Sequence, residues 1–362
     1  MLIIDAHLDL SWNALQWGRD LLQSVNTIRT LEGAAVGKGR GVGTVALPEL
    51  RRGRVAISVA TLIARSTGRP VPHLDYPTPI QAYGVAQGQL AYYRALEHVG
   101  AIRILTDLDA LNQHMADWQR WETQGASGET PPLGFVISME GADPIMEPGQ
   151  LAEWHAAGLR LLGITHYGPG RYAGGTGTEL GLTALGPPLL REMDRLGVLL
   201  DLTHCSDESF WQALDHYGGP VLASHNNCRA LVVHQRQFSD DQLRAIIARD
   251  GVIGAALDTW MLKPGWVIGE RFDPANPPVA LNDVVDHIDH VCQLAGSSRH
   301  AAIGSDLDGG FGREQSPRDL DTIADLQKIA QLLEKRGYAA ADIAAIMHGN
   351  WVRLLQSSWA RA

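Results

Sequence analysis

Two apolar runs, each ending in a histidine, constrain the fold of this chain more than any other feature. Residues 198–225 read VLLDLTHCSDESFWQALDHYGGPVLASH, so the first run ends at His204, the second at His225, and an amphipathic segment lies between them. Two short strands joined by a helical crossover form a parallel βαβ unit. Both histidines should therefore lie at the carboxyl end of a sheet, where α/β folds place their functional groups. Neutral imidazole is a common metal ligand, although a buried histidine bonded to the backbone explains the pair equally well.

The alternation of strand and helix extends along the whole chain. Eight short apolar runs are each followed by a helical segment, which is typical of a TIM-type (β/α)8 barrel with parallel strands and insertions. A length of 362 residues fits one such barrel, so we expect 1–362 to form a single domain. A doubly wound sheet is the alternative, but no G-x-G-x-x-G motif follows the first run. The predicted strands are 2–5, 54–63, 133–139, 159–165, 198–203, 221–224, 251–257 and 301–305, and the predicted helices include 79–99, 105–121, 149–157, 187–196, 240–249, 281–294, 320–336 and 340–356.

The composition argues against several kinds of partner. The formal net charge is −10 and no long run of Lys and Arg occurs, which argues against a nucleic-acid partner. No apolar run approaches the length of a membrane span, and a first strand starting at residue 2 leaves no room for a signal peptide. Three cysteines are too few for a disulfide framework, and we expect them to be buried. We therefore expect a cytoplasmic protein without a membrane partner.

Polar side chains follow the predicted strands at the edge where a barrel would bring them together. Side chains alternate along a strand, so His7 and Asp9 point to the same side and can share a metal ion. Buried carboxylates without partners are costly, and a pair of divalent cations would remove that cost. Imidazoles and carboxylates without thiolates suit zinc or another first-row ion, and two ions sharing one carboxylate are the simplest arrangement. The seven residues are His7, Asp9, Glu140, His166, His204, His225 and Asp306.

Several longer motifs make the chain similar to one known family. They are IIDAHLDL at 3–10, SMEGAD at 138–143, LGITH at 162–166, GLTALGPPLLREMDRLGVLLDLTH at 181–204, PVLASHNNCRAL at 220–231, GSDLDG at 304–309 and HGNWVRLL at 348–355. In these motifs, almost from end to end, the chain resembles the renal (membrane) dipeptidases, peptidase family M19, a branch of the amidohydrolase-type barrels. The resemblance implies a binuclear zinc site in which His7 and Asp9 hold one ion, His204 and His225 hold the other, and Glu140 bridges the two.

The resemblance also implies roles for three residues that contact the substrate. His166 would steady the tetrahedral intermediate, Arg236 would bind the substrate carboxylate, and Asp306 would lie near the substrate amino group and the reacting water. General chemistry agrees, since an oxyanion needs a donor, a carboxylate suits a planar bidentate arginine, and a carboxylate can carry a proton to the leaving amine. Arg171 and Arg229 are rivals for the role of Arg236.

The chain departs from the family pattern around the expected pocket. Leu8 replaces the usual Asn between the first ligands and no Pro follows, residues 167–171 replace an Asn-containing loop, and 258–261 replace an aromatic-Pro run. We expect neither the secretory signal nor the lipid anchor of the animal enzymes in this protein. Residues 259–280 form a predicted lid or wall in which Trp260 and Trp266 could line the pocket.

Some polar residues have plainer explanations. Asp308 is either a partner of the site or a turn residue before two glycines. Five histidines outside the strand ends, and the cysteines next to the strands, are predicted to be surface or core residues rather than ligands. The histidines are His155, His216, His234, His287 and His290.

We expect a zinc-dependent dipeptidase that hydrolyses dipeptides by means of a metal-bridging hydroxide. The same barrel and metals could instead act on N-acyl amino acids, dipeptides that contain a D-amino acid, or lactams. A non-catalytic binding protein is the third hypothesis, and the presence of every expected ligand type argues against it. The sequence leaves open the native metal, the side-chain preference and the oligomeric state, for which a homodimer is one alternative.

Overall fold

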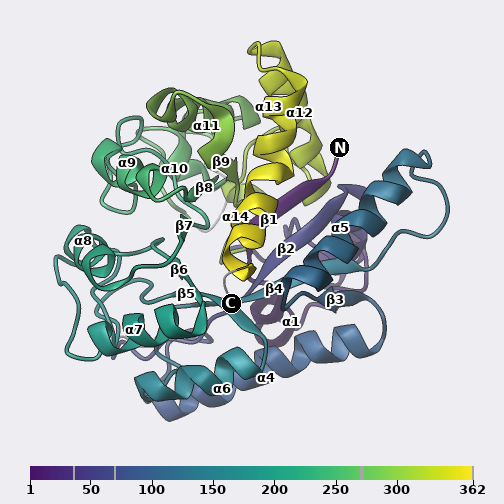
Figure 1. Cartoon of the computed structure of the whole chain (residues 1–362). Coiled ribbons are helices and arrows are strands. Elements are labelled where there is room, and N and C mark those ends of the chain that lie inside the picture. The colour runs from purple at the N-terminus through teal and green to yellow at the C-terminus, as the bar shows by residue number, and fades with distance from the viewer. Residues whose placement is uncertain (36, 69–70, 270–272, 361–362) are drawn as a thin grey trace.

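The computed structural model describes the chain except for residues 36, 69–70, 270–272 and 361–362. Eight parallel strands follow one another in sequence around a nearly closed barrel, with helices around the outside (Figure 1). All eight predicted strands are present, so the prediction of a (β/α)8 barrel is confirmed. These strands are β1 (Ile3–Leu8), β2 (Val55–Leu62), β4 (Leu133–Glu140), β5 (Leu159–Gly163), β6 (Leu199–Asp201), β7 (Val221–Ala223), β8 (Val252–Ala255) and β9 (Ala301–Ile303).

The early strands are long and buried along their whole length. Every residue of β1, β2 and β4 is buried, which is why their sequences read as nearly continuous apolar runs. The ninth strand, β3 (Ile102–Ile104), was not predicted, and it pairs with β4 at the side of the barrel path. Asp107 caps the helix that follows by accepting from the backbone N–H of Ala110 at 2.8 Å, so this helix starts at Leu108 rather than at the predicted residue 105.

Side-chain hydrogen bonds join the two ends of the strand series. The buried Asp5 carboxylate on β1 accepts from the backbone N–H of Ser305 at 2.8 Å and from its hydroxyl at 2.5 Å. The N–H of Asp306 approaches the carbonyl of His7 at 3.3 Å beside these bonds. This junction brings the chain after β9 next to the end of β1, although about 300 residues separate them, as a barrel requires.

The helices mostly follow the predicted ranges, and their ends have identifiable causes. Thr78 and Gln81 form a capping box at the start of α4, and Gly197, with φ of 70°, ends α7. The predicted helix 340–356 is divided by a π-helical turn at Ala345–Gly349. The helices are α1 (Leu10–Gln16), α2 (Val25–Leu31), α3 (Leu47–Arg52), α4 (Pro79–His98), α5 (Leu108–Thr123), α6 (Leu151–Ala156), α7 (Gly186–Leu196), α8 (Asp207–His216), α9 (Asp240–Ala248), α10 (Thr259–Leu262), α11 (Leu281–Ala295), α12 (Gln327–Lys335), α13 (Ala340–Ala344) and α14 (Asn350–Trp359).

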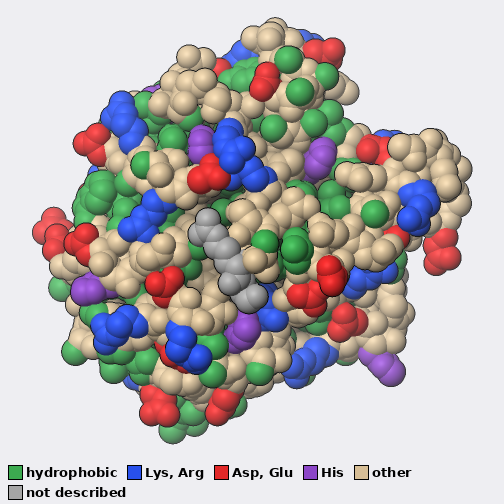
Figure 2. Space-filling view, viewed as in Figure 1, with side chains coloured by type: hydrophobic (Ala, Val, Ile, Leu, Met, Phe, Trp, Pro, Cys, Tyr) green, Lys and Arg blue, Asp and Glu red, His purple; other side chains and the backbone are tan. Residues whose placement is uncertain are grey.

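The surface and the cysteines agree with the composition. On the face drawn in Figure 2, acidic and basic side chains are interspersed rather than gathered by sign. Among the helices that the structure describes, none has both the length and the apolar character needed to cross a bilayer. The three cysteines are buried and unpaired, as predicted. The predicted loop 259–280 begins with the short helix α10, and residues 270–272 of this loop lie outside the described chain.

Candidate metal and substrate site

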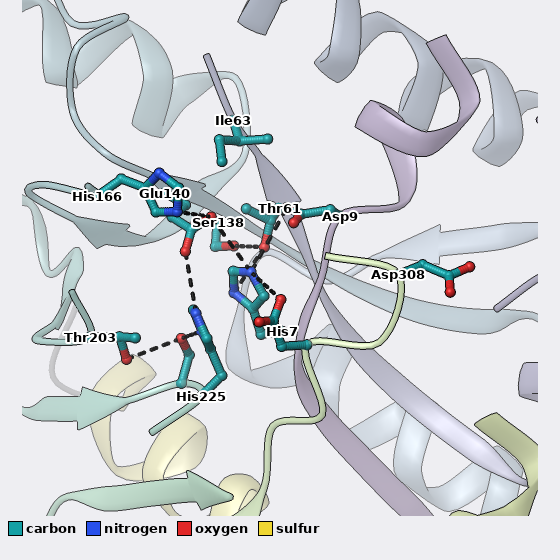
Figure 3. A network of polar contacts seen from close by, with 12 residues as sticks. His7, Asp9, Thr61, Ile63, Ser138, Glu140, His166, Thr203, His225 and Asp308 are labelled. Atoms are coloured by element: carbon teal, nitrogen blue, oxygen red, sulfur yellow. Dashed lines mark hydrogen bonds and ion pairs between the residues drawn. The ribbon is translucent and has the colours of Figure 1, made fainter. Parts of the chain in front are cut away.

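The barrel brings the polar residues of the strand ends together at one rim. His7 lies within β1 near its end, Glu140 is the last residue of β4, and the others follow their strands by one to three residues. Figure 3 shows His7, Glu140, His166 and His225 converging on a common centre. His204 and Asp306 have positive φ angles of 67° and 58°, a backbone conformation that non-glycine residues rarely adopt and that often marks functional sites.

The Glu140 carboxylate lies between the predicted ligands. Its Oε1 is 3.1 Å from Nε2 of His204 and 3.3 Å from Nε2 of His225, and its Oε2 is 3.7 Å from Nε2 of His7. Nε2 of His7 is also 3.8 Å from Oδ1 of Asp9 and 3.9 Å from Oδ1 of Asp306. The five residues predicted to hold metal thus form one continuous cluster, with the Glu140 carboxylate between three imidazoles.

Among the residues that the structure describes, three groups of side chains have the spacing of a metal site. His166 and Asp306, which the sequence analysis did not count as ligands, each belong to one of these groups. The groups are His7 with Glu140 and His225, Glu140 with His166 and His204, and His7 with Asp9 and Asp306. Distance alone therefore does not decide which imidazoles hold a cation.

Unsatisfied polar atoms test whether a cation fits here. Nε2 of His7, Oδ1 of Asp9 and Oε1 of Glu140 are buried without a hydrogen-bond partner among the described residues. Buried polar atoms are nearly always paired, so three such atoms within one cluster indicate a missing partner that accepts lone pairs. Imidazole nitrogen and carboxylate oxygen are both ligands of first-row divalent ions, and the residues present therefore fit a metal centre.

The electrostatics of the cluster agree with this interpretation. Burial raises the pKa of Glu140 to about 7 and holds the pKa of Asp306 well above its ordinary value. Burial alone would lower the pKa of His7, but the neighbouring carboxylates, Glu140 foremost, raise it to about 10. Burial and then the Arg236 charge hold the pKa of His204 well below its ordinary value. Without a metal, the raised pKa values of Glu140, Asp306 and His7 favour their protonated forms, and bound cations would displace these protons.

Hydroxyl groups orient three of the imidazoles. In each case a Ser or Thr oxygen lies beside Nδ1, leaving Nε2 directed toward Glu140, and such outer partners fix ring orientation in metal sites. The pairs are His7 with Thr61 at 3.4 Å, His204 with Thr176 at 3.0 Å, and His225 with Ser224 at 2.9 Å. Sequence reasoning missed all three hydroxyl residues, because Ser and Thr are too common along the chain to stand out.

Arg236 faces this centre with a buried guanidinium group. Its side chain is 2% exposed and donates to Oδ1 of Asn226 and to the carbonyl of His225, each at 2.8 Å. No carboxylate of the described residues lies within ion-pair distance of its guanidinium. Of its rivals, Arg229 is paired with Asp207 at 2.6 Å and 2.8 Å, and Arg171 donates to a backbone carbonyl outside the cavity. Arg236 therefore keeps a buried positive charge available for a ligand.

A cavity of about 230 Å³ opens above the cluster. Trp12, Tyr167 and Trp260 line it, whereas Trp266 lies in a separate neighbouring cavity. The residues that line the cavity are Asp9, Trp12, Lys38, Ile63, Arg65, Leu74, Glu140, His166, Tyr167, His204, His225, Arg236, Asp258, Trp260, Met261, Ile268, Asp306, Gly309, Gly310 and Gln315.

Two cavity residues were not singled out from the sequence. The buried Asp258 accepts from Nε2 of Gln315 at 2.7 Å and from the indole N–H of Trp260 at 2.6 Å, and burial raises its pKa to about 6. Arg65, which follows β2, approaches His166 with Nη1 at 3.1 Å from Nδ1. Arg65 belongs to none of the sequence motifs, so the sequence alone did not point to it.

Two of the residues with plainer explanations, Asp308 and His287, lie away from the centre. Asp308 points away from the cluster (Figure 3), accepting from Arg19 at 3.1 Å and from the backbone N–H of Thr44 at 2.7 Å. His287 is buried and accepts from the backbone N–H of Cys228 at 3.1 Å. Asp308 therefore fixes the chain after β9, and His287 is a core residue.

A known protein family matches nearly the whole chain, and individual relatives match about three fifths of it. The family model of membrane dipeptidases, peptidase family M19, matches residues 1–360. A Klebsiella pneumoniae protein from the pqqA 5′ region is 31% identical over 240 residues, or 64% of this chain and 84% of that protein. The dipeptidase aclJ of Aspergillus oryzae is 30% identical over 230 residues, which are 61% of this chain and 51% of the fungal protein. The match thus spans about half the length of that relative.

Solved structures share the fold. A dipeptidase AC of metallopeptidase family M19 superposes with a TM-score of 0.75 at 25% identity, covering 99% of both chains. A metallopeptidase from Rhodobacter sphaeroides, bound to a phosphinate mimic of the dipeptide L-Ala-D-Ala, gives the same TM-score at 24% identity and the same coverage. The present chain belongs to the membrane dipeptidase family, peptidase family M19, and is a hydrolase of the metallo-dipeptidase type.

Proposed function

We propose that this protein is a zinc-dependent dipeptidase with two metal ions. His7 and Asp9 would hold one ion, His204 and His225 the other, and Glu140 would bridge them. The observation that carries the proposal is the position of the Glu140 carboxylate between three imidazoles, with three buried ligand atoms unpaired. When bound, a zinc pair supplies Lewis-acid polarisation of the scissile carbonyl and activates water for attack.

The remaining polar residues of the cavity recognise the substrate. Arg236 binds the free carboxylate of the dipeptide through a bidentate pair, since its charge has no acidic partner within the described chain. His166 donates a hydrogen bond to the oxygen that becomes negative during attack. Asp306 lies 3.9 Å from His7 at the cavity floor, where its carboxyl group can move a proton toward the leaving amine.

The two acids of the cavity favour a substrate with a free amino group. Asp258 and Asp306 both line the cavity, where Asp258 is buried and Asp306 is half-buried. Among the described residues, neither carboxylate has a cation within 4 Å, apart from His7 beside Asp306. A substrate ammonium group would pair with them, whereas an N-acyl amino acid would bring a neutral methyl group to the same place. We therefore favour dipeptides over N-acyl amino acids.

A matched pair of substrates tests this function. Glycyl-L-alanine and N-acetyl-L-alanine share the leaving amino acid and differ by one amino group. Zinc-loaded protein should contain two ions per chain, and its kcat/KM for the dipeptide should exceed that for the acetyl compound by about tenfold or more. Faster hydrolysis of N-acetyl-L-alanine would contradict the dipeptidase function and indicate a hydrolase of N-acyl amino acids with the same fold.

We also infer that the chain acts as one unit in the cytoplasm. The family match over residues 1–360 supports a single domain, and the three unpaired cysteines are typical of a reducing compartment. A homodimer remains a prediction, and light scattering of the purified protein tests it.

A further inference from the structure

Arg65 is held rigidly in the loop that follows β2. Its backbone N–H donates to the carbonyl of Leu74 at 2.8 Å, and its carbonyl accepts from the N–H of Tyr76 at 2.8 Å. The side chain is 8% exposed, and its Nε lies 3.6 Å from a carboxylate oxygen of Asp75. Asp75 in turn accepts from the backbone and the hydroxyl of Thr67. The guanidinium therefore occupies a fixed position at the wall of the cavity.

The contact between Arg65 and His166 fixes the hydrogen positions on the imidazole. Nη1 of Arg65 lies 3.1 Å from Nδ1 of His166, and a guanidinium can only donate. Nδ1 must therefore accept, so the single ring proton of the neutral imidazole sits on Nε2. The opposite tautomer would place an N–H against an N–H in a buried site.

The other three imidazoles of the cluster have a different kind of partner. Their Nδ1 atoms lie beside hydroxyl groups, which accept a hydrogen bond as readily as they donate one. With the proton on Nδ1, each Nε2 keeps its lone pair for a cation. His166 lies as close to Glu140 as His7 does, with Nε2 at 3.7 Å from Oε2, but it presents an N–H there instead of a lone pair.

We propose that Arg65 is a positioning residue that holds His166 as an Nε2–H donor and thereby excludes it from the metal ligands. The same contact points the N–H into the cavity, where the negative oxygen of the reaction would develop. This inference depends on the proposed function only for that last role. The tautomer and the exclusion from the ligand set follow from the contacts of Arg65 alone.

Nitrogen-15 NMR of histidine-labelled protein tests the tautomer without any turnover. His166→Gln assigns the signal, and the spectra are recorded with and without zinc. We expect Nδ1 of His166 to be unprotonated and Nε2 protonated in both states, and Arg65→Lys, which keeps a cationic donor, to preserve this pattern. Arg65→Met should shift the proton toward Nδ1. A wild-type His166 that carries its proton on Nδ1, or binds zinc through Nε2, overturns the inference whatever the enzyme hydrolyses.

Kinetics distinguish a positioning role from a substrate contact. Loss of one aligned donor to an oxyanion lowers kcat by about 100-fold, so Arg65→Met should lower kcat on the order of 10- to 100-fold while KM changes little. Zinc content should stay at two ions per chain. Arg94→Met is the matched control and should leave kcat unchanged. Arg94 lies on α4, and within the described part of the chain it donates only to the carbonyl of Ala157. A loss confined to KM would show that Arg65 binds the substrate instead.

Discussion

Replacing Arg236 by Met tests how the enzyme recognises the end of its substrate. Methionine has a similar length and keeps the apolar contacts of the arginine stem while removing all five N–H donors. Two donors hold Oδ1 of Asn226 and the carbonyl of His225, so three remain for a ligand. The variant therefore loses a bidentate bond to the substrate carboxylate together with two internal bonds.

The magnitude follows from the burial of the charge. A hydrogen bond to a charged group contributes about 1.5–3 kcal/mol, so two such bonds amount to about 3–6 kcal/mol. Since each 1.4 kcal/mol corresponds to a factor of ten, kcat/KM should fall by roughly 100- to 10,000-fold. The guanidinium is almost completely buried, so little of this effect is screened by solvent.

A cycle with an amidated substrate isolates the carboxylate contact. Wild-type enzyme should lose about as much activity on glycyl-L-alaninamide as Arg236→Met loses on glycyl-L-alanine, and the variant should no longer distinguish the two substrates. Zinc content must be measured in parallel, because Arg236 also supports the carbonyl of His225. Arg229→Met serves as the control, since its guanidinium is paired with Asp207. If Arg236→Met with two bound ions still prefers glycyl-L-alanine over glycyl-L-alaninamide as strongly as the wild type does, another residue binds the substrate carboxylate.

Four further predictions concern the metal centre and the barrel. Glu140→Gln should lose one or both ions, and full zinc occupancy by atomic absorption would contradict its bridging position. Thr176→Val should weaken zinc binding about 10- to 100-fold in a chelator competition, because Nδ1 of His204 loses its partner, and an unchanged affinity would count against this support. In metal-free protein the raised pKa of His7 contributes stability that is complete below pH 6.5 and is lost as pH rises through about 10. Zinc binds only the neutral ring, so the difference in Tm between zinc-loaded and metal-free protein should widen from pH 6.5 upward. A constant or narrowing difference in Tm would contradict the assignment of His7 as a zinc ligand. Asp5→Ala should lower the free energy of unfolding, measured in urea, by about 3 kcal/mol or more, because it removes the hydrogen bonds that join the chain after β9 to β1. A loss below about 1 kcal/mol would mean that the barrel closes without these hydrogen bonds.

The sequence predicted the barrel because its strands are mostly apolar and almost entirely buried. β2 and β4 are buried throughout and stand out as continuous runs, whereas β3 has only three residues, one of them Arg103, and pairs with a single neighbour. The predicted helix 340–356 also missed a π-helical turn, since a change of hydrogen-bond register leaves the apolar spacing nearly intact.

The sequence identified those site residues that lie at the ends of predicted strands. His7 and Glu140 stand at strand ends, and the resemblance to known dipeptidases supplied their roles. Arg65 could not be found in this way, because it is 101 residues from His166 and belongs to no motif. The same holds for Asp258, whose importance depends on burial and on partners that only the fold brings near.

Zinc anomalous diffraction from crystals of the purified, zinc-loaded protein tests the central claim most directly. The account predicts two peaks on either side of the Glu140 carboxylate, one beside His7 and Asp9 and the other beside His204 and His225, at a separation of about 3.5–4 Å. A single peak, or a peak bound to Nε2 of His166, would contradict it.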